Sequence, residues 1–88
     1  MAYKISITKT AEKELSKLDK QTALRIIRFL RERLSVSENP KSLGKELAGS
    51  LSLFWRYRVG DYRIICDVKD DELVIVALRI GHRKEIYK

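Results

Sequence analysis

Arg56, Arg58 and Arg63 stand in a β-prone segment, residues 54–63, whose intervening positions carry aromatic and branched residues. Because successive side chains of a strand point to opposite faces, inward-facing aromatic residues would send Arg56 and Arg58 outward together. A hairpin turn at Gly60-Asp61 would bring Arg63 onto the same face. Like charges this close repel each other, and a phosphate group would offset that repulsion. The segment therefore predicts an anion site. A solvated sheet face with its arginines paired to nearby aspartates is the alternative.

The C-terminal run from Arg79 to Tyr87 is the second concentration of reactive side chains, with His82 and Arg83 inside it. Histidine can exchange a proton near neutral pH without large tuning. A tyrosine needs cationic neighbours that favour its phenolate, and the arginines could supply them. Proton transfer is one interpretation of this run. A surface histidine and a tyrosine that only packs or stacks are the other.

Metal and cofactor chemistry lack the residues they need. The chain has one histidine and one cysteine, and its four glycines stand apart, so neither a zinc cluster nor a glycine-rich phosphate loop is predicted. Cys66 follows two isoleucines and is expected to be a buried thiol. What is left for a basic, metal-free ribonuclease is attack by the RNA 2′-hydroxyl on the adjacent phosphate, which needs cations and a proton shuttle.

The size and net charge of the chain limit the classes of partner that it is expected to bind. The 88 residues suit one domain, residues 1–88, and the formal net charge of +7 steers polyanions toward the surface. Nucleic acid is therefore the favoured partner, and a membrane surface is a weaker alternative because the apolar residues recur through a whole globular pattern. No long apolar stretch is present, so a cytoplasmic protein is expected.

The elements that must position these residues follow from periodicity. Residues 3–8 alternate as a half-buried strand, and Thr8 or Thr10 can cap a short helix after it. Asp19 can cap a second helix that ends before residues 37–40. Residues 40–52 are expected to form an ordered loop, and three strands are predicted at 53–59, 62–69 and 73–80. This order predicts an α+β fold, in which a helical hairpin packs on one face of a three- to four-stranded antiparallel meander.

Residues 54–63 (FWRYRVGDYR) and 81–87 (GHRKEIY) together resemble the RelE/ParE toxins of bacterial and archaeal toxin–antitoxin pairs. The similarity spans nearly the whole chain and implies the RelE-like microbial ribonuclease fold. By this resemblance, Arg63 contacts the scissile phosphate and Arg83 stabilises the transition state. Tyr87 stacks on the cleaved nucleotide, and either His82 or Tyr87 transfers the proton. The implied RNA-binding residues are Arg56, Arg58, Arg63 and Lys84.

The resemblance also implies a function and partners. RelE-like members cut messenger RNA in the ribosomal A site and leave a 2′,3′-cyclic phosphate without a cofactor. They are held inactive by an acidic, RelB-like antitoxin that folds on binding. ParE-like members share the fold and poison DNA gyrase instead, so a gyrase poison without nuclease activity is the alternative function. A catalytically degenerate, RNA-binding homologue is a third.

Overall fold

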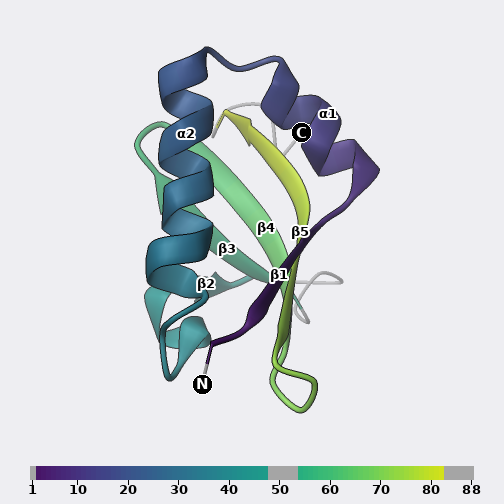
Figure 1. Ribbon diagram of the computed structural model, residues 1–88, viewed down its shortest axis with the longest axis vertical. Helices are drawn as coiled ribbons and strands as arrows, with labels where there is room; N and C mark the ends of the chain where they lie inside the picture. Colours follow the sequence, from purple (N-terminus) through teal and green to yellow (C-terminus); the bar gives the residue numbers. More distant parts are fainter. Residues whose placement is uncertain (1, 48–53, 83–88) are drawn as a thin grey trace.

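The computed structural model describes residues 2–47 and 54–82. The predicted α+β class is confirmed: one strand, two helices and then the remaining strands follow each other along the chain (Figure 1). The elements are β1 (Lys4–Ile7), α1 (Lys9–Ser16), α2 (Lys20–Arg28), a π-helical continuation η1 (Phe29–Leu34), a 3-10 turn η2 (Pro40–Leu43), β2 (Lys45–Glu46), β3 (Trp55–Val59), β4 (Tyr62–Lys69) and β5 (Val74–His82).

The five strands form one sheet in the order β1-β5-β4-β3-β2. The predicted meander of β3, β4 and β5 is confirmed as antiparallel. The sheet as a whole is mixed, because β1 returns along the far edge and pairs with β5 in parallel. The expected loop at 40–52 contains, in its described part, the 3-10 turn and the two-residue strand β2, which pairs with β3. A two-residue strand is too short to leave an alternating pattern in the sequence.

Both helices begin at the capping residues that the sequence indicates. The Thr8 side chain accepts a hydrogen bond from the Ala11 N–H, and the Asp19 carboxylate accepts one from the Thr22 N–H. Each cap satisfies a backbone donor that has no partner within its own helix. The two caps therefore fix where the helices of the hairpin begin: α1 follows β1, and α2 follows α1.

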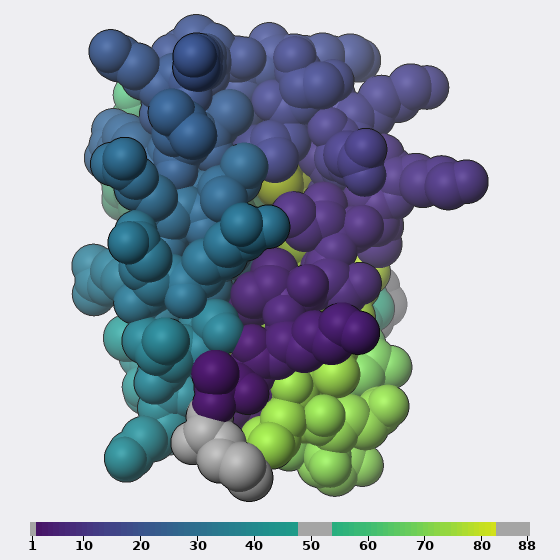
Figure 2. Space-filling model, in the orientation of Figure 1, coloured from purple at the N-terminus to yellow at the C-terminus, as the bar shows by residue number. Residues whose placement is uncertain are grey.

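One face of the sheet packs against the hairpin and forms the core. Ile26, Leu30 and Leu34 recur every four residues along α2 and η1, and all three are buried. They meet inward-facing side chains of the meander, Tyr57, Ile64, Cys66, Ile75, Ala77 and Ile80. Figure 2 shows this side of the molecule, where side chains of β1 and the two helices cover most of the sheet. No helix among the described residues is long and apolar enough to cross a membrane.

A β-bulge in β5 changes which side chains face the core. Ile65 pairs with Arg79, whereas the next residue of β4, Cys66, pairs with Ala77, so Leu78 is an extra residue. The Thr8 hydroxyl donates to the Leu78 carbonyl and thereby satisfies an acceptor where β1 ends. An extra residue shifts the alternation of a strand by one position. Side chains beyond the bulge therefore lie on the face opposite to the one that a strict period of two would give.

Candidate functional site

The three arginines of the predicted anion site share one face of the sheet. Arg58 pairs directly with Arg63 across the β3–β4 hairpin, and Arg56 lies two residues before Arg58 on the same strand. Their neighbours Tyr57 and Ile64 are buried on the helix-covered face. Alternation along the two strands therefore places the three guanidinium groups on the other face. We call this the open face, since neither α-helix packs against it.

These arginines border a cleft of about 340 Å³. Its other wall comes from the 3-10 turn and β2, and Lys45 pairs with Arg56 across the β2–β3 ladder. Lys45 adds a fourth cation that the sequence analysis did not single out. The lining residues are Ser42, Leu43, Gly44, Lys45, Arg56, Tyr57, Arg58 and Arg63.

Two close contacts fix the wall of the cleft against β3. The buried Tyr57 hydroxyl donates a hydrogen bond to the Pro40 carbonyl over 2.8 Å. Burial raises the pKa of Tyr57, so its hydroxyl stays protonated and acts as a donor. A Cβ at Gly44 would lie 2.5 Å from the Arg56 carbonyl oxygen and 2.7 Å from the Tyr57 ring. Only glycine lets the two segments approach this closely, and Gly44 and Pro40 are the sequence signals that could have indicated it.

Two aspartates of the meander, Asp67 and Asp70, have lysine partners. Asp70 forms an ion pair of 2.8 Å with Lys41 and accepts a hydrogen bond from the Tyr3 hydroxyl. These two hydrogen bonds lower the pKa of Asp70. Asp67 lies 3.8 Å from the Lys69 ammonium. At the hairpin, the Arg58 Nε donates to the Gly60 carbonyl at 3.2 Å.

His82 lies on the helix-covered face, opposite the three arginines. It pairs with Tyr62 across the β4–β5 ladder, and the two rings meet edge to face with centroids 5.7 Å apart. Counted from the buried Ile75 in steps of two, position 82 would fall on the open face. The bulge at Leu78 reverses this parity. The structure therefore places His82 and Arg63 on opposite faces, although His82 directly follows Gly81, the residue that pairs with Arg63.

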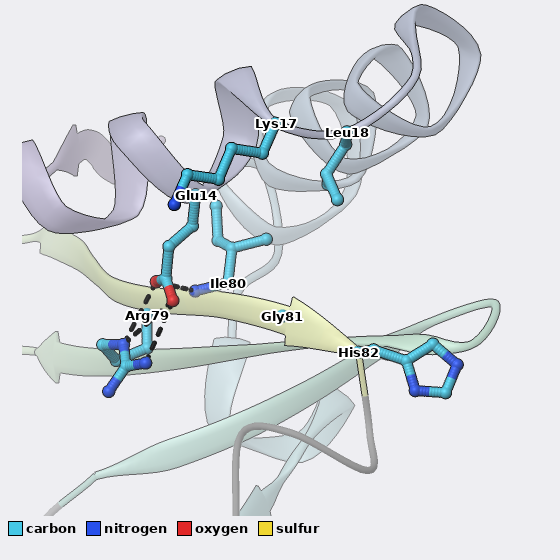
Figure 3. A pocket seen from close by; sticks show the side chains of 7 residues that line it. All are labelled: Glu14, Lys17, Leu18, Arg79, Ile80, Gly81 and His82. Atoms are coloured by element: carbon cyan, nitrogen blue, oxygen red, sulfur yellow. Dashed lines mark hydrogen bonds and ion pairs between the residues drawn. The ribbon is translucent and has the colours of Figure 1, made fainter.

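His82 is one of the residues that line a cavity of about 210 Å³ between α1 and the end of β5 (Figure 3). The Arg79 Nε–H is shared between the two Glu14 carboxylate oxygens, and the Arg79 Nη2 donates a further hydrogen bond of 3.0 Å to Glu14 Oε2. It also accepts the Ile80 N–H at 2.9 Å, a donor that β1 does not reach. Figure 3 shows the His82 ring directed away from this cluster. Partial burial acts to raise the pKa of Glu14, but the bonds from Arg79 and Ile80 outweigh it and lower the pKa.

Some of the remaining predicted residues lie outside the described part of the chain, and the others can be placed. Arg83, Lys84 and Tyr87 lie outside the described residues. Cys66 is buried as predicted, and burial raises the pKa of its thiol, which makes it a poor nucleophile. Within residues 2–47 and 54–82, no group of three or more histidine, cysteine and carboxylate side chains could hold a metal ion. The chemistry that the described site can do is electrostatic, namely the binding of an anion by clustered guanidinium groups.

The sequence is similar to those of known toxins. The family described as "ParE toxin of type II toxin-antitoxin system, parDE" matches residues 5–87. Toxin RelG of Mycobacterium tuberculosis is 34% identical over 93 residues, which cover 100% of this chain and 99% of that protein. Toxin RelE of the same organism is 30% identical over 86 residues, covering 98% and 87% of the two chains.

Solved structures give the same result. A chain of the toxin–antitoxin complex RelBE2 from Mycobacterium tuberculosis superposes with a TM-score of 0.86 at 29% identity and covers 97% of this chain and 95% of its own. A chain of the archaeal RelE–RelB complex from Pyrococcus horikoshii has a TM-score of 0.74 at 30% identity, with 97% and 99% covered. A small mixed sheet with a helical hairpin on one face is thus a fold that this chain shares with solved toxins. The chain belongs to the RelE/ParE superfamily of toxins from type II toxin–antitoxin systems.

Proposed function

We propose that this toxin is a metal-independent endoribonuclease that cuts messenger RNA in the ribosomal A site. The observation that carries the proposal is the gathering of Arg56, Arg58 and Arg63 around one cleft, with Lys45 opposite Arg56. Guanidinium groups are suited to phosphate because they form paired, charge-assisted hydrogen bonds and stay protonated. Two similar proteins of Mycobacterium tuberculosis bear the names Toxin RelG and Toxin RelE, which supports a toxin of the RelE kind.

In the proposed reaction the 2′-oxygen of the RNA attacks the adjacent phosphorus. A new P–O2′ bond forms and the P–O5′ bond breaks, which leaves a 2′,3′-cyclic phosphate and a free 5′-hydroxyl. One group of the toxin or ribosome accepts the 2′-hydroxyl proton and another donates a proton to the departing 5′-oxygen. Arg63, Arg56 and Arg58 would hold the negative charge that grows on the phosphate oxygens, and no step requires a cofactor.

Tyr87 and His82 are the two candidates for the group that transfers the proton. The position of His82 on the helix-covered face, with its ring against Tyr62, favours Tyr87. Tyr87, together with Arg83 as a transition-state cation and Lys84 as a phosphate contact, rests on the family resemblance. A Tyr87→Phe variant that keeps full activity, with a His82→Gln variant that loses it, would reverse this preference.

The proposed partners are the ribosome with its messenger RNA and a cognate antitoxin. Solved relatives of this chain are complexes of RelE with RelB, which supports an antitoxin for this toxin as well. The net charge of +7 favours an acidic, RelB-like antitoxin that folds on contact. Because its target would be the ribosome, we place its action in the cytoplasm.

The test is to incubate the purified toxin with programmed 70S ribosomes and to map the ends of the messenger RNA. The proposal predicts cuts with cyclic phosphate ends in the wild type. It predicts none in an Arg63→Ala and Arg83→Ala double variant, since each lost charge-stabilising group removes about 2.7 to 4 kcal/mol of barrier lowering. Intact messenger RNA with wild-type toxin would overturn it.

A gyrase poison of the ParE type is the second candidate, because the matching family is described as the ParE toxin. The same preparation would then inhibit DNA supercoiling by purified gyrase and leave messenger RNA intact. A homologue that only binds RNA would do neither.

A further inference from the structure

We infer that the toxin has a second phosphate-binding surface, formed by α2, η1 and the β3–β4 turn, that holds the backbone of structured RNA beside the cleft. We call it the α2 patch, and it consists of Arg25, Arg28, Arg33 and Arg58. It borders a hollow of about 340 Å³ whose other lining residues are Phe29, Glu32, Val59 and Gly60. This inference rests on the proposed function for its choice of RNA as the ligand.

The hairpin turn is where the patch comes together. Gly60 has a φ of 60°, the left-handed region that favours glycine and that a tight hairpin turn uses. Its missing side chain leaves room for Arg25, whose Nη1 lies 3.5 Å from where a Cβ would be. On the same residue, the carbonyl oxygen accepts the Arg58 Nε–H. Two guanidinium groups from distant parts of the chain therefore converge on one turn.

Helical spacing extends the patch along one side of the helix. Arg25 and Arg28 are three residues apart, and Arg33 follows one turn after Phe29, so these side chains share a face. From Arg25 to Arg33 the helix rises about 12 Å. This span exceeds a single phosphate group and suits a chain of phosphates.

The charges of the patch are not balanced within the protein. All four arginines are exposed, and none has an ion-pair partner among residues 2–47 and 54–82. Glu32 is the one acidic residue that lines the hollow. Neighbouring cations repel each other, and the negative charge of a bound polyanion offsets this repulsion. The counterions that the polyanion releases favour binding further.

The patch is continuous with the cleft, because Arg58 lines both. An RNA strand whose scissile phosphate lay between Arg56 and Arg63 could be flanked by further RNA that runs around the hairpin turn onto α2. The occupant we commit to is structured RNA, since four of the eight residues that line the hollow are arginines and only one, Glu32, is acidic.

The test compares two triple variants that each remove three positive charges. One is Arg25→Gln with Arg28→Gln and Arg33→Gln. The matched control is Lys4→Gln with Lys9→Gln and Lys13→Gln, three exposed lysines on β1 and α1. Arg58 is kept because it also lines the cleft. Circular dichroism and thermal melting check that both variants fold. Anisotropy of a fluorescein-labelled RNA hairpin gives the Kd from about 50 to about 200 mM salt.

The patch variant should bind the hairpin about 10- to 100-fold more weakly at low salt, and its log–log salt slope should fall by about 2 to 3. The control should lose less than about threefold, because its charges act only at long range. Equal losses in the two variants, or no loss in either, would overturn the inference. A patch variant that binds RNA normally but loses affinity for an acidic antitoxin peptide would also overturn it.

This outcome is separable from the proposed function because binding is measured without cutting. A selective loss of RNA affinity in a protein that never cuts messenger RNA would keep the α2 patch and reject the nuclease. If the patch variant and the control cut messenger RNA on ribosomes equally well, the nuclease proposal would stand and the α2 patch would be rejected.

Discussion

The two faces of the sheet are built from alternate residues of the same strands, yet they have opposite chemistry. The helix-covered face is apolar and buried, with Ile64 and Ile80 in its centre. The open face gathers Arg56, Arg58 and Arg63 around a cleft. Because neighbouring residues serve different faces, the residues that stabilise the fold and those that we propose to bind anions can change independently. Stability and activity should therefore separate cleanly in variants of adjacent positions.

The largest expected effect on stability lies on the helix-covered face. Leu30, a residue of η1, is 1% exposed and belongs to the core between the helices and the sheet, so Leu30→Ala should lower the free energy of unfolding by about 2 to 5 kcal/mol. Urea denaturation followed by circular dichroism measures this. Leu24, on the same helix but 44% exposed, is the matched control and should lose much less as Leu24→Ala. Similar losses at the two positions would contradict the assignment of the core.

The contact between the two segments that form the cleft comes next. Gly44→Ala places a methyl group 2.5 Å from the Arg56 carbonyl, so the wall of the cleft must move. We expect a loss of about 1 to 3 kcal/mol in unfolding free energy, together with weaker binding of RNA. Lys45→Ala is the comparison, because it removes a cleft cation without crowding the backbone. A Gly44→Ala variant with the melting temperature and RNA affinity of the wild type would contradict the close approach of Gly44 to Arg56.

An effect on stability of similar size, without a shift of the cleft wall, is expected from the hydrogen bond under the cleft. Tyr57→Phe leaves the buried Pro40 carbonyl without its donor and should cost about 1 to 3 kcal/mol at most. The ring still packs against Phe29, whose centroid lies 5.8 Å away, so the fold should persist. Thermal melting would show the loss, and an unchanged melting temperature would mean that the hydroxyl does not anchor the 3-10 turn.

The smallest expected effect is a pH dependence at Glu14. Its pKa in the folded protein is lowered from 4.5, so its contacts with Arg79 and Ile80 add stability above that pH. They lose this contribution as the pH falls through the folded pKa. The difference in unfolding free energy between the wild type and Glu14→Gln should therefore be present at neutral pH and shrink below about pH 4.5. A difference that stays constant into strong acid would contradict the role of the carboxylate charge.

Local signals in the sequence predicted the local structure well. The caps at Thr8 and Asp19 and the meander around Gly60-Asp61 follow from rules that act over a few residues. The parallel pairing of β1 with β5 could not be predicted, because it joins the two ends of the chain and depends on how the whole sheet assembles. The expected fold class was correct, but the local signals did not predict that the sheet is mixed.

The candidate site was predicted in part for the same reason. Alternation along β3 and β4 was enough to place Arg56, Arg58 and Arg63 on one face. The position of His82 depends on the bulge at Leu78, which no turn residue marks in the sequence. Lys45 enters the cleft through a two-residue strand that has no pattern of its own.

The most direct test of the separation between the two faces uses the neighbours Arg63 and Ile64. We would measure the unfolding free energy and the single-turnover rate of messenger RNA cleavage on ribosomes for Arg63→Ala and Ile64→Ala. Arg63→Ala should keep stability within about 0.5 kcal/mol and slow cleavage by about 10²- to 10³-fold. Ile64→Ala should lose about 2 to 5 kcal/mol of stability, and the fraction that stays folded should cleave normally. An Arg63→Ala variant that cleaves at the wild-type rate would contradict the account.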